Sequence, residues 1–399
     1  MEFNQTQKTL LGVLAHELTG TEYEISESTD WATLFAESKA QAVAPMVFSC
    51  VSDQCKDPEV FQKWRDLTMR ALQRNMHVQL QHGALHRLMT AHNIPYCIIK
   101  GCASAKDYPD SLLRAMGDVD FIVPDAFWDK AKQVLLENGF TSSGEDHEFH
   151  LAFHKKNINM EMHHEPFGLK GEKEQLLLEI VPELIDNSTM AYCDGASFRM
   201  PDAFGHGIVI LLHAYRHLVS SGVGVRHLCD WAAFVSGFSN EEFVGIFRER
   251  FQELGIWKLA QAFGTTAHRY LAIPYQDWMG VVDEEICHML MMDIFNGGNF
   301  GRGGGDRETQ GKLLEVQGEG RSPIGRGIQL LRDLNQTAVS RYPRAMKNPI
   351  LRPFGWLILG VRYVFRVLTG KRKKTPSDTM QIVYMRKKLY QELAAFETK

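Results

Sequence analysis

The chain has 399 residues, of which 44% are hydrophobic and 23% charged, and its net charge is -4. This length allows two or three domains, and the composition is ordinary for a soluble globular protein. The N-terminus carries no basic segment ahead of a long apolar stretch, so we expect no secretory signal. The longest apolar run, residues 354–361, is far shorter than the roughly 20 residues that a membrane-spanning helix requires.

Seven cysteines, an odd number without a Cys-x-x-Cys pair, are evidence against a disulfide framework or a zinc site. We expect free thiols in a reducing cytoplasm. Charge is unevenly distributed, because residues 334–377 hold ten Lys or Arg and no Asp or Glu. This asymmetry indicates a polyanionic partner or a membrane surface for the tail.

Residues 1–92 are predicted to be helical, because their apolar side chains recur at helical spacing. Asn93 and Pro95 end the last of these helices. The pattern then changes. Two short apolar runs that contain β-branched residues, 96–99 and 121–123, predict buried strands.

The spacing between Pro124 and Gly139 predicts a helix with Asp125 as its N-cap and Gly139 just beyond its end. Its inner face is formed by Ala131, Val134 and Leu135. Two alternating segments, 148–154 and 158–163, then predict strands that bury one face each. Together these elements predict a small mixed α/β (α+β) core.

The predicted organisation has four parts. The core occupies residues 93–200, after the helical segment 1–92. Residues 201–296 are predicted to form a second helical region. The last part, residues 297–399, begins with a glycine-rich stretch and ends in a basic helical tail. The glycines at 297–305 follow no strand and lack Gly-x-Gly-x-x-Gly spacing, so a mobile linker is favoured over a phosphate-binding loop.

Asp118 and Asp120 are two residues apart on a predicted strand, so their side chains should project together. Two neighbouring carboxylates in a partly buried site repel each other unless a cation lies between them. Mg²⁺ fits this need, since proteins usually hold it with one or two carboxylates and substrate phosphates. A solvated strand end with two acids is the alternative.

Three neighbours favour the metal site. Lys100 and Gly101 follow the first strand at its carboxyl end, where open α/β sheets bind ligands, and Ser104 offers a hydroxyl to a phosphate. Arg114 can pair with a phosphate through two hydrogen bonds. Glu161, on the strand expected beside the Asp strand, can complete a cluster of three carboxylates.

These residues resemble an uncharacterised bacterial nucleotidyltransferase family of the polymerase-beta superfamily. The most specific stretch is 113–123 (LRAMGDVDFIV), which follows an Ile-Lys-Gly at 99–101. Residues 160–163 (MEMH) are similar to the acid-x-His strand of that family. The segments 212–217 (LHAYRH) and 226–230 (RHLCD) are similar to its downstream helical motif. The likeness extends from about Ile94 to Val235, with a weaker echo at Arg341-Tyr342-Pro343.

The resemblance implies transfer of a nucleoside monophosphate from an NTP, such as ATP, to a hydroxyl, with release of pyrophosphate. Asp118, Asp120 and Glu161 would hold Mg²⁺ or Mn²⁺, and Glu161 alternatively takes the proton of the attacking hydroxyl. Lys100 and Arg114 would neutralise charge on the pyrophosphate. The acceptor is open between RNA, a small metabolite, a sugar and a protein side chain.

One residue departs from the superfamily pattern. The superfamily opens its site with Gly-Gly or Gly-Ser, whereas Gly101 is followed by Cys102. This leaves the usual phosphate contact in question, although Ser104 can replace it.

His213 and His217 lie four residues apart, on one face of a predicted helix. This spacing also occurs in zinc sites, but the sequence offers no obvious third ligand. Contacts of both histidines, Arg226 and Asp230 with the triphosphate or base are favoured over metal binding. A buried structural Arg–Asp pair is the main alternative.

A second group of histidines lies in and beside the predicted strands, and strand alternation places two of them, His150 and His154, on one face. Solvent-facing side chains are the favoured interpretation for the whole group, which comprises His147, His150, His154, His163 and His164.

The basic tail contains a helical apolar face with arginines opposite it. This face consists of Phe354, Leu357, Ile358, Val361, Phe365 and Leu368. Packing against the core is slightly favoured over an interfacial helix on anionic lipid, and contact of residues 341–374 with nucleic acid is a third possibility.

Two other functions are compatible with the sequence. One is a catalytically silent nucleotide-binding or scaffold protein. The other is a membrane-peripheral accessory protein of an envelope-polymer or peptide-biosynthesis pathway. Three intact acids favour activity, and only the basic tail supports the accessory role. We expect a cytoplasmic location, or a cytoplasmic membrane surface if the tail binds lipid.

Overall fold

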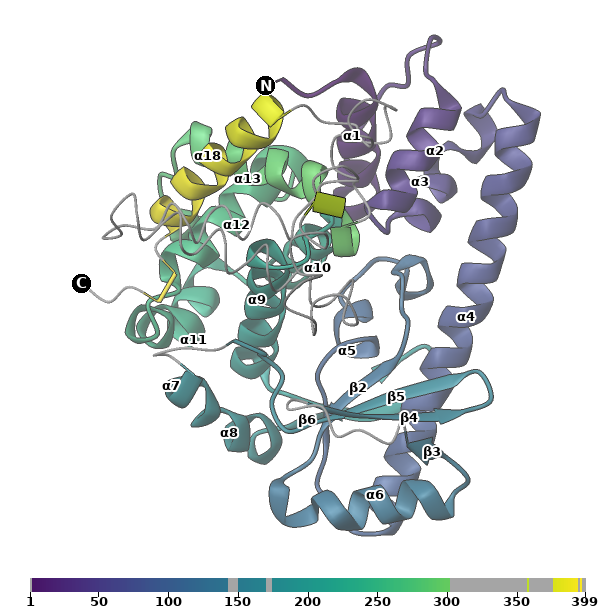
Figure 1. The fold of residues 1–399 in the computed structure, drawn as a ribbon, viewed down its shortest axis with the longest axis vertical. Helices are drawn as coiled ribbons and strands as arrows, with labels where there is room; N and C mark the ends of the chain where they lie inside the picture. Colours follow the sequence, from purple (N-terminus) through teal and green to yellow (C-terminus); the bar gives the residue numbers. More distant parts are fainter. Residues whose placement is uncertain are drawn as a thin grey trace.

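A long helix, α4, joins a group of N-terminal helices to a mixed sheet in the computed structural model (Figure 1). The structure describes residues 2–142, 150–169, 174–301, 357–358, 376–393 and 395–396. The mixture of helices with a five-stranded and a two-stranded sheet confirms the predicted α+β fold.

The predicted helical character of residues 1–92 is confirmed. The helices are α1 (Gln5–Thr19), α2 (Trp31–Ala40), α3 (Ala44–Val51) and α4 (Pro58–Ala91). Asp57 caps the start of helix α4, because its side chain accepts hydrogen bonds from the backbone N–H groups of Glu59 and Val60. It ends just before Asn93, which adopts a positive φ of 52°.

Five strands form the main sheet in the order β1-β2-β5-β4-β3. They are β1 (Cys97–Ile98), β2 (Val119–Ile122), β3 (Thr141–Ser142), β4 (His150–Lys155) and β5 (Ile158–His163). Strands β2 and β5 are parallel, and Asp120 lies opposite Glu161. All other pairs in this sheet are antiparallel. The predicted position of Glu161, on the strand beside the Asp strand, is therefore confirmed.

Helix α6 (Trp128–Glu137) buries the predicted inner face of Ala131, Val134 and Leu135 in the core of the sheet. The predicted N-cap is wrong, because Asp125 begins a 3-10 turn, Asp125–Phe127, and α6 starts after it. The end of α6 is as predicted, since Gly139 takes the positive φ of 81° that follows many helices.

A two-stranded hairpin, β6 (Thr189–Cys193) and β7 (Ala196–Met200), was not predicted. Its turn residues Asp194 and Gly195 both have positive φ, 41° and 90°, as a tight hairpin turn with right-handed strands requires. The hairpin packs on α4 and buries Phe198 in the core of the sheet. Two short helices, α7 (Glu174–Leu178) and α8 (Val181–Asp186), precede it.

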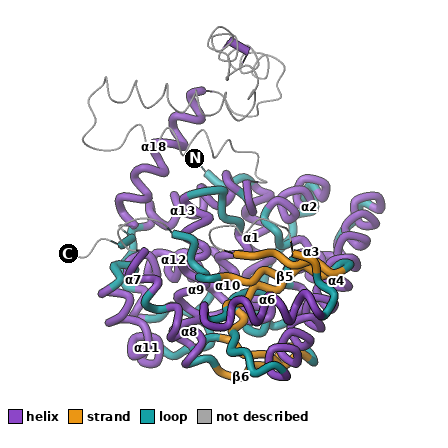
Figure 2. The backbone as a smooth tube through the Cα atoms, turned by 60° about the horizontal axis from the view of Figure 1, so that its bottom comes forward, coloured by secondary structure: helices purple, strands orange, loops and turns teal. Residues whose placement is uncertain are grey.

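The helices predicted after residue 201 are present. They are α9 (Ala203–Val219), α10 (Val225–Val235), α11 (Asn240–Glu253), α12 (Trp257–Leu271) and α13 (Glu284–Gly297). A last helix, α18 (Pro376–Leu393), packs against α13 and α12 (Figure 2). There, the fully buried Arg386 forms an ion pair with the equally buried Asp293.

The predicted glycine-rich linker begins inside the fold. Gly297 is the last residue of α13, and the turn Asn299–Gly301 lies against Gly222. The rest of that stretch and the predicted apolar face of the tail lie outside the described residues, apart from Leu357 and Ile358.

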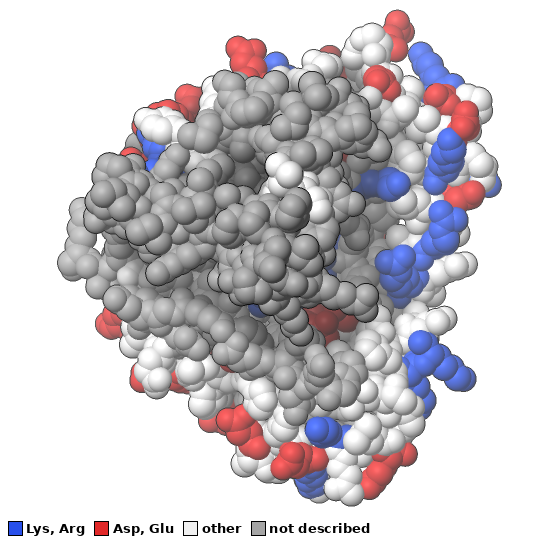
Figure 3. Space-filling view, in the orientation of Figure 1, with Lys and Arg blue, Asp and Glu red and all other residues white. Residues whose placement is uncertain are grey.

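Exposed basic side chains gather along the edge that α4 forms (Figure 3). They are Lys63, Arg65, Arg70, Arg74 and Arg87. In the part of the chain that the structure describes, no helix is long and apolar enough to cross a membrane.

Candidate active site

The parallel pairing of β2 with β5 brings acidic side chains together. Asp120 lies opposite Glu161, and His163 follows two residues further along β5. Oxygen and nitrogen atoms of these three residues lie within 4.8 Å of one another, close enough to share a metal ion. Asp118 immediately precedes β2, and the charges of Asp120 and Glu161 both act on it.

Asp120 is buried and receives two donors on one oxygen. Lys100 Nζ and His163 Nε2 each lie 2.9 Å from its Oδ1. Burial raises the pKa of Asp120, but Lys100 and His163 outweigh burial and hold the pKa below its usual range. Asp120 is therefore ionised at neutral pH, and its Oδ2 is the oxygen left for another cation.

Asp118 has the opposite electrostatic environment. The charge of Asp120, burial and the charge of Glu161 together raise the pKa of Asp118 to about 7. Because Lys100 and His163 hold Asp120 in its ionised form, Asp118 is the acid of this pair that carries the proton. The repulsion expected between the two acids is thus present.

The favoured interpretation of His163 as solvent-facing is wrong. Its side chain is 6% exposed and bonded to Asp120, and its Nε2 lies 3.5 Å from Glu161 Oε2. Although burial lowers the pKa of His163, its hydrogen bonds to Asp120 and Glu161 raise it overall. His163 thus belongs to the acidic cluster, a position that the solvent-facing interpretation missed.

His150 is partly buried, with Nε2 3.9 Å from Glu161 Oε2. His154 is exposed, as expected, and so is His164, which stacks on Trp128. His147 lies outside the described residues.

Gly101 is required by a close approach of His82. The φ of Gly101 is +64°, and a Cβ at this position would lie 2.7 Å from His82 Nε2. His82 Nδ1 lies 2.8 Å from the Val78 carbonyl, to which it can donate, and its Nε2 then accepts the Cys102 N–H at 3.4 Å. The Cys102 amide is therefore engaged within the protein, at the position where Cys102 departs from the superfamily pattern.

Arg114 forms a buried pair with Asp230 of α10. Its Nε and Nη2 donate to the two carboxylate oxygens at 2.7 and 2.9 Å, and both side chains are 6% exposed. The Tyr108 hydroxyl donates to the same carboxylate at 2.6 Å. Arg114 Nη1 also reaches the Gly101 carbonyl at 3.3 Å. The structural Arg–Asp pair considered from the sequence is present, with Arg114 rather than Arg226 as its cation.

The loop before Asp118 is braced by Asn75 of α4, which sequence reasoning also missed. Its side-chain amide donates to the carbonyls of Leu112 and Arg114, and its oxygen accepts the Met116 N–H at 3.1 Å. Asn75 is buried, so these bonds hold the loop to α4 without competition from water.

A family model described as an uncharacterised nucleotidyltransferase matches residues 27–272, which is more than half of the chain. The chain belongs to this nucleotidyltransferase family. Comparison with curated proteins and with solved structures gives no match. Family membership supports a general nucleotidyl-transfer function, and the matched range contains the whole acidic cluster.

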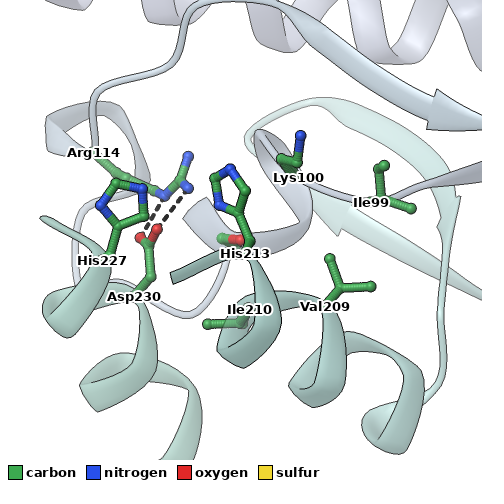
Figure 4. A pocket seen from close by; sticks show the side chains of 9 residues that line it. Ile99, Lys100, Arg114, Val209, Ile210, His213, His227 and Asp230 are labelled. Atoms are coloured by element: carbon green, nitrogen blue, oxygen red, sulfur yellow. Dashed lines mark hydrogen bonds and ion pairs between the residues drawn. The ribbon is translucent and has the colours of Figure 1, made fainter. Parts of the chain in front are cut away.

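A pocket of the nucleotidyltransferase lies beside the acidic cluster, where the sheet meets α9 and α10 (Figure 4). Five of its lining residues were predicted to bind the nucleotide, namely Lys100, Ser104, Arg114, His213 and Asp230. A sixth, His227, follows the predicted Arg226 in the sequence. Apolar side chains of Ile99, Val209 and Ile210 line the rest. Nucleotide contacts by these residues, by His217 and by Arg226 stay predictions.

Arg226 lies close to the same groups. Its Nη1 donates to the Ala115 carbonyl at 3.1 Å, and its buried Nε has no hydrogen-bond partner among the described residues. Burial lowers the pKa of Arg226, as does Arg114, while Asp230 and Asp118 raise it. Arg226 thus supplies a cation within electrostatic reach of Asp118.

The structure places a third histidine beside His213 and His217. His227, in the first turn of α10, lies beside His213 and His217 of α9, with ring centroids 5.3 and 5.4 Å away. The sequence offered no obvious third ligand for the pair, and the structure places a candidate beside it. The signal was present in the sequence, because His227 directly follows Arg226 in the downstream motif.

Proposed function

We propose that this nucleotidyltransferase transfers a nucleoside monophosphate from an NTP to a hydroxyl group of its acceptor, with Mg²⁺ or Mn²⁺ as cofactor. The observation that carries the proposal is the juxtaposition of Asp118, Asp120 and Glu161 around the parallel strands β2 and β5. Among the described residues, Lys100, His163 and, at 3.9 Å, His150 form ion pairs with these acids, and Lys100 is the one Lys or Arg among them. The cluster is therefore short of positive charge.

The donor set fits a hard divalent cation. Magnesium prefers carboxylate oxygens, and Asp120 Oδ2, Asp118 and Glu161 offer them. Asp118 would give up its proton when the cation binds, because the cation removes the repulsion that raises its pKa. When bound, the metal would supply charge neutralisation for the triphosphate and for the charge that develops during transfer.

Residues of this chain would perform the remaining steps. The acceptor oxygen attacks the α-phosphorus, the bond from that phosphorus to the bridging oxygen breaks, and pyrophosphate leaves with the electron pair. Glu161 is partly exposed and ionised, since the His163 hydrogen bond outweighs burial and lowers its pKa, so it can accept the hydroxyl proton. His163 holds Glu161 and Asp120 in place.

Positive side chains would bind the triphosphate. Lys100 lines the pocket and already contacts Asp120, which places its ammonium group between the acids and the pocket. Arg226 carries an N–H without a partner among the described residues. We assign Arg114 a positioning role, since its guanidinium is held by Asp230 and ties the Asp118 loop to α10.

Two substitutions test the proposal. Asp118→Asn should weaken binding of Mn²⁺-NTP or Mg²⁺-NTP in calorimetry and abolish turnover, whereas Asp129→Asn, at an exposed acid of α6, should change neither. Unchanged metal-nucleotide affinity in Asp118→Asn would remove Asp118 from the site.

Glu161→Gln separates an enzyme from a scaffold. We expect it to preserve NTP binding far better than transfer, because a base acts in the reaction and not in the ground state. Equal loss of binding and transfer would instead assign Glu161 a ground-state or structural role. A wild-type chain that binds metal-NTP without any turnover would favour a silent nucleotide-binding protein.

A further inference from the structure

We propose that His213, His217 and His227 form a second metal site, which binds one divalent transition-metal ion of the zinc class. The three imidazoles come from two packed helices, α9 and α10. Their potential ligand nitrogens lie within 4.8 Å of one another. Metal binding here does not depend on the proposed function and can be measured without a nucleotide.

The spacing of the nitrogens is close to that of a zinc site. His213 Nε2 and His217 Nε2 lie 3.0 Å apart. Two nitrogens on one tetrahedral zinc, each about 2.0–2.1 Å from the ion, are separated by about 3.3 Å. A shift of a few tenths of an ångström therefore fits the α9 pair, and the His227 ring centroid lies 5.3 and 5.4 Å from theirs.

The outward-facing ring nitrogens have the partners that metal-binding histidines use. His217 Nδ1 lies 2.9 Å from the Ser221 hydroxyl, and His227 Nδ1 lies 3.4 Å from the Gly224 carbonyl. A metal-bound histidine usually donates its other N–H to such an oxygen, which fixes the ring and its tautomer. With both Nδ1 atoms protonated, Nε2 is the ring nitrogen that His217 and His227 would present to a metal, in place of its present contacts with His213 Nε2 at 3.0 Å and with Arg226 Nη2 at 3.4 Å.

The side chains are suited to an ion that prefers nitrogen. An all-imidazole set favours zinc, copper, nickel or cobalt over magnesium, which prefers oxygen. His217 and His227 are buried and His213 is partly buried, and the neutral imidazole is the form that binds metals. The acidic cluster, with its carboxylates, would take the magnesium.

The surroundings indicate what the metal would hold. His213 and His227 project toward the same pocket as Lys100 (Figure 4). Three protein ligands leave a fourth position open, as in zinc sites that bind a ligand or substrate. Lys100 and Arg226 lie near enough to act electrostatically on His213. An anion, such as a phosphate or carboxylate oxygen, is therefore the ligand class that suits the open position.

Cobalt titration of the full-length, chelator-treated protein tests the site directly. We expect one Co²⁺ per chain with the intense visible absorption of four-coordinate cobalt, and displacement of that Co²⁺ by one equivalent of Zn²⁺. The Asp120→Asn variant, which disables the acidic cluster, should keep this spectrum. His77→Ala, at an exposed histidine of α4, should also keep it.

Substitutions of the ligands should remove the signal. His213→Ala, His217→Ala and His227→Ala should each weaken Zn²⁺ binding by more than about 100-fold, and Ser221→Ala by about 10–100-fold, because it removes only an outer partner. Where an alanine variant does not fold, the glutamine variant of the same histidine replaces it in this test. Thermal melting in the presence of a chelator shows whether each variant folds.

Three results would overturn the proposal. One is a wild-type protein that takes up no stoichiometric Co²⁺ or Zn²⁺, in which case a proton shared by His213 and His217 explains their contact. The second is weak absorption, typical of six-coordinate cobalt. The third is a signal that the histidine variants keep and Asp120→Asn loses, which would assign the metal to the acidic cluster.

Discussion

Replacing Asp118 with asparagine should stabilise the metal-free protein even though it destroys the site. In the wild type, the charge of Asp120, burial and the charge of Glu161 raise the pKa of Asp118 to about 7. Asparagine has nearly the same shape and no charge. The substitution therefore removes the repulsion without opening a cavity.

The size and sign of the effect follow from linkage. An unperturbed aspartate has a pKa of about 3.9, and each unit of difference corresponds to about 1.4 kcal/mol. The folded state keeps a proton that the unfolded state releases between pH 4 and 7, so the wild type loses stability as pH rises through this window. Above pH 7 we expect Asp118→Asn to be more stable by up to about 4 kcal/mol.

Urea unfolding in the presence of a chelator measures this difference. The advantage of the variant should grow from pH 5 to pH 8 and then level off. Asp129→Asn, at an exposed acid, should show no such trend. A variant that is no more stable than wild type at pH 8, or equally favoured at pH 5 and pH 8, would show that Asp118 is not under this repulsion.

Three further changes test the framework of the site. Asp230→Asn leaves the buried Arg114 guanidinium without its counter-charge, so we expect the free energy of unfolding, measured with urea, to fall by about 3–5 kcal/mol. A decrease below about 1 kcal/mol would contradict a buried pair. Gly101→Ala places a Cβ against His82 at a positive φ and should lower the melting temperature. A double variant that also carries His82→Ala should recover part of this loss, and an unchanged melting temperature in Gly101→Ala would refute the packing. Truncation after Pro343 removes α18 and its four buried aliphatic side chains. Burial of each such side chain stabilises the fold by roughly 1.5–3 kcal/mol, so we expect the truncated protein to unfold or aggregate. A truncated chain that melts like the full one but no longer sediments with anionic vesicles would instead favour a lipid-binding tail.

The parts of the site that depend on local sequence could be predicted. Strand segments with β-branched or alternating residues identified β2 and β5, and their pairing placed Glu161 beside Asp120. Such features follow from spacing and chemistry within a few residues.

The rest depended on contacts between distant segments. His163 shares a strand face with Glu161, and alternation alone assigned that face to solvent, whereas Asp120 and Lys100 of other segments surround it. His227 joins the α9 histidines only because α9 packs on α10. The Arg114–Asp230 pair likewise joins residues 116 positions apart. The hairpin β6–β7 is a different case, since its Asp194-Gly195 turn is a local signal in the sequence.

Labelling the two ends of the triphosphate separately tests nucleotidyl transfer most directly. Incubation of the protein with Mg²⁺ and α-labelled NTP, in the presence of cell extract, RNA and protein acceptors, should give a labelled product and one pyrophosphate for each transfer. Neither should appear with Asp120→Asn. Transfer of the γ label instead, or equal transfer of the α label by wild type and Asp120→Asn, would contradict nucleotidyl transfer at this acidic cluster.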